Sequence, residues 1–189
     1  MGYHADMAAM QTRPRKTLDD FLSLPEGTLA ELIDGEILMT PAPRKPHQLL
    51  VGDLYFALRL FLGAKPLGML YLAPFDVHLP SGDVVEPDLI FVAQANLGIV
   101  QEWVRGVPDL LVEVVSPSHP ERDRLVKRAL YARNGVREFW IVDPEEKTVE
   151  VLALDVDRYR PAGFFREPEI LVSPLLAGLA LPLGQLFTP

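Results

Sequence analysis

The pattern of apolar residues along the 189-residue chain predicts an α/β fold of the mixed α+β type, with a mixed central β-sheet flanked by helices. Short apolar runs of strand length recur through the chain, and two stretches with apolar residues at helical spacing interrupt them. An Asp-Gly pair between two strand-like runs adds an N-terminal β-hairpin. We expect a single domain over residues 17–189, preceded by a flexible arm at residues 1–16, which lack periodicity.

The first elements are a short helix and the hairpin. Thr17 is a suitable N-cap for a helix over residues 18–24, because acidic residues follow in its first turn. The apolar runs at 29–33 and 36–39 flank Asp34-Gly35, a dipeptide typical of tight hairpin turns.

The longest helix is predicted over residues 47–62, where apolar side chains recur at helical spacing at Leu50, Leu54, Leu58 and Phe61. A glycine at each end of residues 63–68 interrupts this pattern. Residues 69–72 and 75–79 then have the composition of strands, and a Pro-Ser-Gly-Asp turn follows at 80–83.

The second half of the chain continues the sheet. After two apolar strands, separated by a loop or short helix near residues 97–105, a second helix is predicted over 120–134 and ends at Asn134-Gly135. Residues 136–143 and 148–152 are predicted as strands, and short terminal strands are expected beyond them.

Two of the apolar strands each contain a carboxylate that burial alone does not explain. Asp88 precedes Leu-Ile-Phe-Val, and Glu113 lies within Leu-Leu-Val-Glu-Val-Val. A buried ionised carboxylate requires a cation or several hydrogen-bond donors. If the two strands are neighbours, both carboxylates can bind one divalent ion, together with the backbone carbonyl of Val114 and water. Lys127, on the helix after Glu113, is the candidate cation near this site, and Asp123 at i−4 can orient it.

Each of these residues also has a structural interpretation. Asp88 can be a strand-start or turn residue, and Asp123 a first-turn acid favoured by the helix dipole. Lys127 can belong to a solvated helix face. The histidines His47, His78 and His119 match no zinc-binding spacing, and His47 near a helix start is expected to be a structural or capping residue.

Composition restricts the classes of function. The formal net charge of −8 argues against a protein that coats nucleic acid through bulk charge, although arginines and lysines cluster over residues 121–137. The absence of cysteine excludes disulfides and thiolate chemistry. There is no run of eighteen apolar residues and no secretory signal, so a cytoplasmic protein without membrane association is expected.

The order of these residues resembles the PD-(D/E)XK nuclease superfamily and, more narrowly, the Uma family of restriction-endonuclease-like proteins. The resemblance covers roughly residues 17–155, and its matching pieces are residues 31–36, 86–92 and 111–118, Asp123 with Lys127, and residues 131–144. It implies a restriction-endonuclease-like core and Mg²⁺- or Mn²⁺-dependent cleavage of DNA. The implied metal ligands are Asp88 and Glu113.

The resemblance also implies Glu31 as a further acid near the metal, although Glu31 can equally be a solvent-facing hairpin residue. One departure concerns the catalytic lysine, which the superfamily places two residues after the glutamate. Val115 occupies that position here, so the resemblance implies that Lys127 on the following helix takes the lysine's role.

The sequence therefore predicts a divalent-metal-dependent DNA endonuclease with Glu31, Asp88, Glu113 and Lys127 as catalytic residues. Because cutting both strands of a duplex requires two sites, a homodimer is expected. The apolar stretch at 170–187 can form the dimer surface or close the core. Two alternatives remain: a non-catalytic nucleic-acid-binding or regulatory module that retains the fold, and a metal-dependent phosphohydrolase acting on a smaller substrate.

Overall fold

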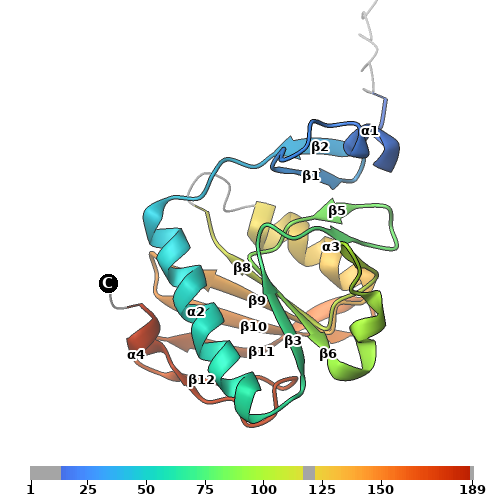
Figure 1. Cartoon of the computed structure of the whole chain (residues 1–189). Helices are drawn as coiled ribbons and strands as arrows, with labels where there is room; N and C mark the ends of the chain where they lie inside the picture. The colour runs from blue at the N-terminus through green and yellow to red at the C-terminus, as the bar shows by residue number, and fades with distance from the viewer. Residues whose placement is uncertain (1–13, 117–121, 188–189) are drawn as a thin grey trace, which may run out of the picture.

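The computed structural model describes residues 14–116 and 122–187, and its centre is a six-stranded sheet in the order β11-β10-β9-β8-β6-β3 (Figure 1). The pair β8 and β9 is parallel and all other neighbours in this sheet are antiparallel. The strands are β3 (Gly68–Leu72), β6 (Leu89–Ala93), β8 (Leu110–Val114), β9 (Glu138–Asp143), β10 (Thr148–Asp155) and β11 (Arg158–Arg166). The predicted mixed sheet is confirmed.

A second, smaller sheet was not predicted. It has five strands in the order β2-β1-β5-β4-β7, and it includes the N-terminal hairpin. Its strands are β1 (Ala30–Ile33), β2 (Glu36–Met39), β4 (Val77–His78), β5 (Val84–Val85) and β7 (Val104–Arg105). Three of them have two residues each, and runs this short have no detectable sequence period.

The predicted N-terminal helix and hairpin are present, although the helix ends at Leu22 and not at residue 24. Helix α1 (Leu18–Leu22) begins at Thr17, whose side chain accepts a hydrogen bond from the Asp20 backbone, while the Asp20 carboxylate accepts one from the Thr17 backbone. Of the expected arm, residues 1–13 lie outside the described part. Lys16 donates a backbone hydrogen bond of 2.7 Å to the Gly35 carbonyl, so the end of the arm is held against the hairpin turn.

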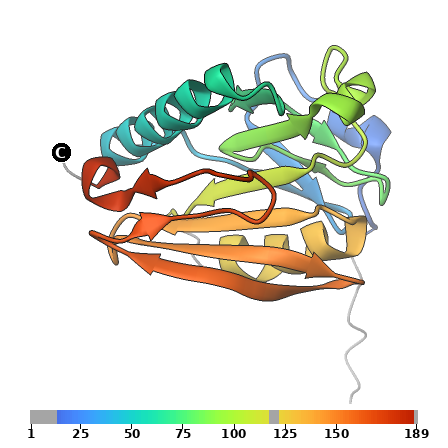
Figure 2. The same ribbon diagram turned by 90° about the horizontal axis from the view of Figure 1, so that it is seen from below.

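Helix α2 (Lys45–Ala64) covers one face of the large sheet (Figures 1 and 2). Its inner side chains, among them Leu54 and Leu58, are almost fully buried and pack against strand residues such as Phe91 and Trp140. The helix extends slightly beyond the predicted range, because Pro46 is well accommodated in its first turn.

Helix α3 (Lys127–Asn134) covers the opposite face, where Leu130 and Tyr131 pack against Ile90 and Phe139. The segment η2 (Arg122–Val126) before it is wound as a π-helix. The predicted helix over 120–134 therefore consists of two different windings. Gly135 ends it at φ 89°, a left-handed conformation that suits glycine.

The C-terminal stretch closes the core. It contains the strand pair β12 (Ile170–Leu171) and β13 (Leu181–Pro182) and the short helix α4 (Leu183–Leu186). Its buried side chains pack in the same cluster as α2: Leu171, Leu176, Leu179, Leu181, Leu183 and Leu186. Of the two roles expected for residues 170–187, the structure therefore assigns most of their apolar surface to the core.

Two local predictions differ from the structure. Residues 94–99 form the 3₁₀ helix η1 (Gln94–Ile99), which is followed by the short strand β7 in place of a single loop or helix near 97–105. The strand expected over 75–79 is reduced to β4. Among the described residues, no helix is both long and apolar enough to cross a membrane.

Candidate active site

The register of β6 and β8 brings Asp88 and Glu113 to facing positions. Leu89 pairs with Val112 and Ile90 with Leu111, so one further step along the same register places Asp88 opposite Glu113. The two strands are therefore neighbours, as the predicted site requires, whereas shared binding of one cation by both carboxylates remains a prediction. The facing positions follow from the antiparallel pairing of two strands that carry their acids near adjacent ends.

Asp88 is held by two contacts. Its Oδ2 accepts a hydrogen bond of 2.7 Å from the Val114 backbone N–H, and it lies 3.3 Å from Nε2 of His47. His47 is in the first turn of α2, so the start of the longest helix contributes to the site. The role of the Val114 carbonyl as a metal ligand remains a prediction.

Lys127 lies between two buried carboxylates. Its Nζ is 2.9 Å from Oε1 of Glu113 and 2.9 Å from Oε1 of Glu31. All three side chains are at most 5% exposed. The interpretation of Lys127 as a solvated helix residue is therefore wrong, and so is that of Glu31 as a solvent-facing hairpin residue. The buried ammonium group of Lys127 is the cation that the two buried carboxylates require.

Tyr131 is a site residue that the sequence reasoning missed. Its hydroxyl donates a hydrogen bond of 2.6 Å to Oε1 of Glu113. Tyr131 follows Lys127 by four positions, so both project from the same face of α3. This spacing was visible in the sequence, but a tyrosine on an apolar helix face is usually a core residue. The side chain of Asp123 lies outside the described part.

The π-helical segment η2 directly precedes Lys127. A π-turn admits one more residue per hydrogen-bonded ring than an α-turn, and it changes the face on which the following residues project. Such turns are frequent at functional sites. Here the winding changes from π to α at Lys127, the residue that contacts both Glu31 and Glu113.

The hairpin places Glu31, and a charged clamp holds the hairpin. The Arg133 guanidinium on α3 contacts Asp34 Oδ1 at 2.7 Å and Asp83 Oδ2 at 3.2 Å. Asp83 also accepts a 2.7 Å hydrogen bond from the Asp34 backbone N–H. The turn of the hairpin is thereby attached both to α3 and to the β4–β5 turn.

One carboxylate oxygen of this site has no hydrogen-bond partner within residues 14–116 and 122–187. Glu31 Oε1 accepts a 3.1 Å hydrogen bond from the Glu86 backbone N–H and contacts Lys127. Glu31 Oε2 is buried and has no hydrogen-bond partner among the described residues. A buried oxygen without a partner is costly, so this atom is a candidate ligand for a cation or an ordered water.

Two further acids complete the site, and the sequence reasoning missed both as site residues. Val77 of β4 pairs with Val85 of β5, so the next step of the register sets Asp76 opposite Glu86. Burial raises the pKa of the Glu86 carboxyl to about 7, and repulsion from Asp76 and Glu31 acts in the same direction. Burial and then repulsion from Glu31 also raise the pKa of Asp76. We name the five acids the acidic cluster: Glu31, Asp76, Glu86, Asp88 and Glu113.

Different features explain why these two acids were missed. Glu86 belongs to the Glu-Pro-Asp motif, in which only the Asp was assigned a role. Asp76 precedes a two-residue strand, and nothing in the local pattern distinguishes it from a loop acid.

The residues fit a divalent cation in charge and chemistry. Carboxylate oxygens are the ligands that Mg²⁺ and Mn²⁺ prefer, and the mutual repulsion within the acidic cluster would be relieved by a dication. The unpartnered Glu31 Oε2 supports the same conclusion. In the conformation described for residues 14–116 and 122–187, no three His, Asp or Glu side chains already converge as a finished ligand set.

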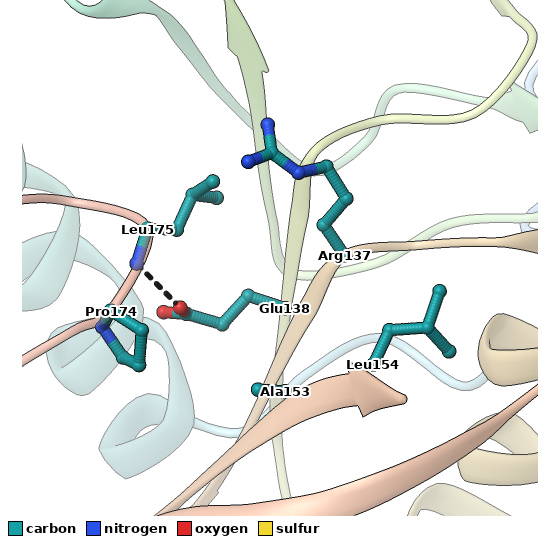
Figure 3. Close-up of a pocket in the computed structure, with 6 residues that line it drawn as sticks. All are labelled: Arg137, Glu138, Ala153, Leu154, Pro174 and Leu175. Carbon is teal, nitrogen blue, oxygen red and sulfur yellow. Dashed lines mark hydrogen bonds between the residues drawn. The ribbon is translucent and has the colours of Figure 1, made fainter. Parts of the chain in front are cut away.

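The other candidate positions lie away from this site. His78 stacks on Trp103, and burial lowers the pKa of its imidazole. His119 falls outside the described residues. A pocket of about 270 Å³ lies at Glu138, which points toward the backbone of Leu175 (Figure 3). Glu138 pairs in register with Leu110 at the start of β8, whereas Glu113 lies near the end of that strand.

Comparison with known proteins agrees with the fold. The chain is similar to a crystal structure from Anabaena variabilis described as a "putative nuclease belonging to DUF820", with a TM-score of 0.76 and 22% identity over 90% of this chain and 97% of the other. At this identity the likeness shows a shared fold. No curated protein matches the chain closely. The family model "Uma2: Putative restriction endonuclease" matches residues 18–184, so the chain belongs to the Uma2 family.

Proposed function

We propose that this protein is an Mg²⁺- or Mn²⁺-dependent DNA endonuclease that hydrolyses phosphodiester bonds at the acidic cluster. The family supports a nuclease. The observation that carries the assignment to this site is the burial of Lys127 between Glu31 and Glu113. An ion pair that serves only the protein surface is exposed to solvent. A phosphoryl-transfer site, in contrast, requires acids and a cation close together.

The residues divide into three roles in this proposal. Asp88 and Glu113 hold the cation, with the Val114 carbonyl as an additional ligand, and Glu31 supports them. A bound divalent cation would polarise a phosphoryl oxygen and lower the pKa of a bound water. Lys127 positions the attacking water and offsets the negative charge that builds on the phosphate. Tyr131 holds Glu113, and His47 holds Asp88, in the orientation that the structure describes.

We further propose that DNA is the substrate, that the protein acts in the cytoplasm, and that two copies act together. Each chain supplies one acidic cluster, and hydrolysis of both strands of a duplex needs two. The net charge of −8 is compatible with this substrate, because five of the acids belong to the cluster and would be partly neutralised by a cation.

Plasmid nicking tests the proposal. Supercoiled DNA is incubated with the protein and Mg²⁺, Mn²⁺ or EDTA, and the Glu113→Ala variant is compared with the wild type. We expect metal-dependent nicking that Glu113→Ala abolishes. The exposed acid Glu102 provides the matched control, and Glu102→Ala is expected to nick at the wild-type rate.

A non-cleaving binding module is the second candidate, and the position of Val115 favours it. The superfamily lysine is replaced there by a valine that is 6% exposed and packs in the apolar core. DNA binding without cleavage in any metal would support this module. Cleavage of only a small phosphate diester, with plasmid left intact, would support a phosphohydrolase.

A further inference from the structure

The outer face of α2 is apolar where a surface helix is expected to be charged. Leu49, Phe56 and Leu60 are 52%, 64% and 61% exposed. They follow one another at helical spacing on the side opposite the buried leucines. In Figures 1 and 2, no described element covers this side of α2. Exposed large apolar side chains along one helix face are typical of an interface.

The same face contains two gaps and two charges. Gly52 and Gly63 are exposed, and a Cβ atom added at either would meet nothing within 4 Å. Asp53 and Arg59 are exposed and form no ion pair with another residue in the described part of the chain. The stripe therefore combines large apolar side chains, open positions beside them, and one charge of each sign.

These positions are arranged symmetrically about Phe56. If two copies of α2 pack antiparallel with a two-fold axis at Phe56, each residue lies at the level of the residue equally far on the other side of Phe56 in the partner. The resulting levels are Leu49 with Gly63, Gly52 with Leu60, and Asp53 with Arg59. Each large leucine therefore lies at the level of a glycine, and each acid at the level of an arginine, whose long side chain can reach across.

We propose that the outer face of α2, from Leu49 to Gly63, is the surface on which a second copy of this chain binds in antiparallel orientation. The charge complementarity between Asp53 and Arg59 favours a second copy, because a helix that meets itself in antiparallel orientation brings each charge to the level of its opposite. The large residues and the glycine gaps obey the same two-fold axis. The outer face of α2 is then the contact surface in the two-copy arrangement proposed above. Binding at this surface does not depend on cleavage.

The interface leaves both acidic clusters accessible. His47 lies nine residues before Phe56 and faces inward to Asp88, away from the outer stripe. With a rise of about 1.5 Å per residue, the two His47 positions lie roughly 27 Å apart along the helix direction, at opposite ends of the interface. Each copy therefore keeps its own complete site.

Charge exchange at the interface tests the proposal. In the Asp53→Arg dimer, arginine lies opposite arginine at both contacts between positions 53 and 59. In the Arg59→Asp dimer, aspartate lies opposite aspartate at both. Each variant is therefore expected to dimerise about tenfold more weakly than the wild type. A mixture of the two variants restores opposite charges at every contact and is expected to form heterodimers. The chain carrying both exchanges is expected to regain the wild-type affinity. Sedimentation over a concentration series, without DNA or metal, measures each constant.

Phe56→Asp tests the centre of the stripe and is expected to give a folded monomer with the circular dichroism spectrum of the wild type. Phe164→Asp, at a 51% exposed aromatic residue on β11, is the matched control and is expected to leave the dimer intact. A wild type that is monomeric at every concentration would overturn the proposal. A dimer that Phe56→Asp breaks, but that the charge exchanges leave unchanged, would overturn the antiparallel register. Because no cleavage is measured, a failed nuclease assay does not affect either outcome.

Discussion

The Lys127 ammonium lies 2.9 Å from the Glu113 carboxylate, although the lysine belongs to α3 and the acid to β8. The two elements meet because α3 packs on the face of the sheet to which Glu113 points. Lys127 thus brings an ammonium group to Glu113 from a helix, whereas Val115 stands two residues after Glu113 on the strand side.

Replacement of Lys127 by methionine is expected to abolish nicking and to destabilise the fold. The substitution leaves Glu31 and Glu113 buried without their cation, which costs about 3–5 kcal/mol. Urea unfolding at neutral pH measures the stability, and plasmid nicking the activity. Lys147→Met, at an exposed lysine paired with Glu167, is the control and is expected to change stability by less than about 1 kcal/mol. Wild-type nicking by the Lys127 variant would contradict the role assigned to Lys127.

Asp88→Asn separates metal binding from folding. The asparagine oxygen can still accept the hydrogen bond from the Val114 backbone, so the fold is expected to persist. Loss of the charge is expected to remove the rise in melting temperature that Mn²⁺ produces in the wild type. Thermal unfolding with and without Mn²⁺ measures both effects. Equal stabilisation of the two proteins by Mn²⁺ would exclude Asp88 as a ligand.

Glu86 is expected to make stability depend on pH. Its folded-state pKa of about 7 exceeds the ordinary value of 4.5, so between these values the folded protein holds a proton that the unfolded chain has released. The contribution of the protonated carboxyl is therefore present at low pH and lost as the pH rises through about 7.

Thermal unfolding of Glu86→Gln in EDTA, from pH 4.5 to 8, checks this sign. The melting temperature of the wild type should fall relative to that of the variant as the pH increases. Glu102→Gln, at an exposed acid, should follow the wild type throughout. Parallel curves for wild type and Glu86→Gln would show that Glu86 does not titrate in this range.

Tyr131→Phe removes the hydrogen bond that the tyrosine hydroxyl donates to Glu113. A hydrogen bond to a buried charged group contributes about 1.5–3 kcal/mol, so we expect a stability loss of that size and slower nicking. Tyr159→Phe is a matched control, because its hydroxyl is also buried and donates to the Val136 carbonyl, away from the acidic cluster. It should lose stability while nicking at the wild-type rate. Equal rates for the two variants would limit Tyr131 to a structural role.

Glu138→Gln is expected to lower stability without affecting cleavage. Oε1 of Glu138 accepts hydrogen bonds from the Trp140 indole and the Ser173 hydroxyl, and Oε2 accepts one from the Leu175 backbone. An amide cannot accept at both positions, so one donor is left unsatisfied at a cost of about 1–3 kcal/mol. Chemical unfolding and nicking measured on the same preparation distinguish this residue from the site acids.

The sequence indicated those site residues whose charge is unusual among their apolar neighbours. Glu113 is noticeable as a carboxylate within an apolar strand, and Asp88 as an acid that begins another. Lys127 was proposed because its helix directly follows Glu113 and because it fits the family motif, although that helix is rich in arginine. The fold class followed from the alternation of strand and helix patterns.

The remaining features depend on tertiary contacts that no local pattern contains. Asp76 faces Glu86 only because two strands of two residues each pair in the small sheet. His47 reaches Asp88 because α2 begins beside the start of β6, and sequence spacing does not give the direction in which a helix crosses a sheet. The π winding before Lys127 is likewise associated with the contacts of Lys127 with Glu31 and Glu113, which lie on other elements.

The distribution of the site over separate elements has a consequence for the order in which the protein is made. Its acids begin at Glu31, but the charge that balances them is on α3, and the tyrosine that donates to Glu113 is residue 131. During translation, the ribosome must therefore release the chain beyond Tyr131 before Glu31 and Glu113 can meet their partners on α3.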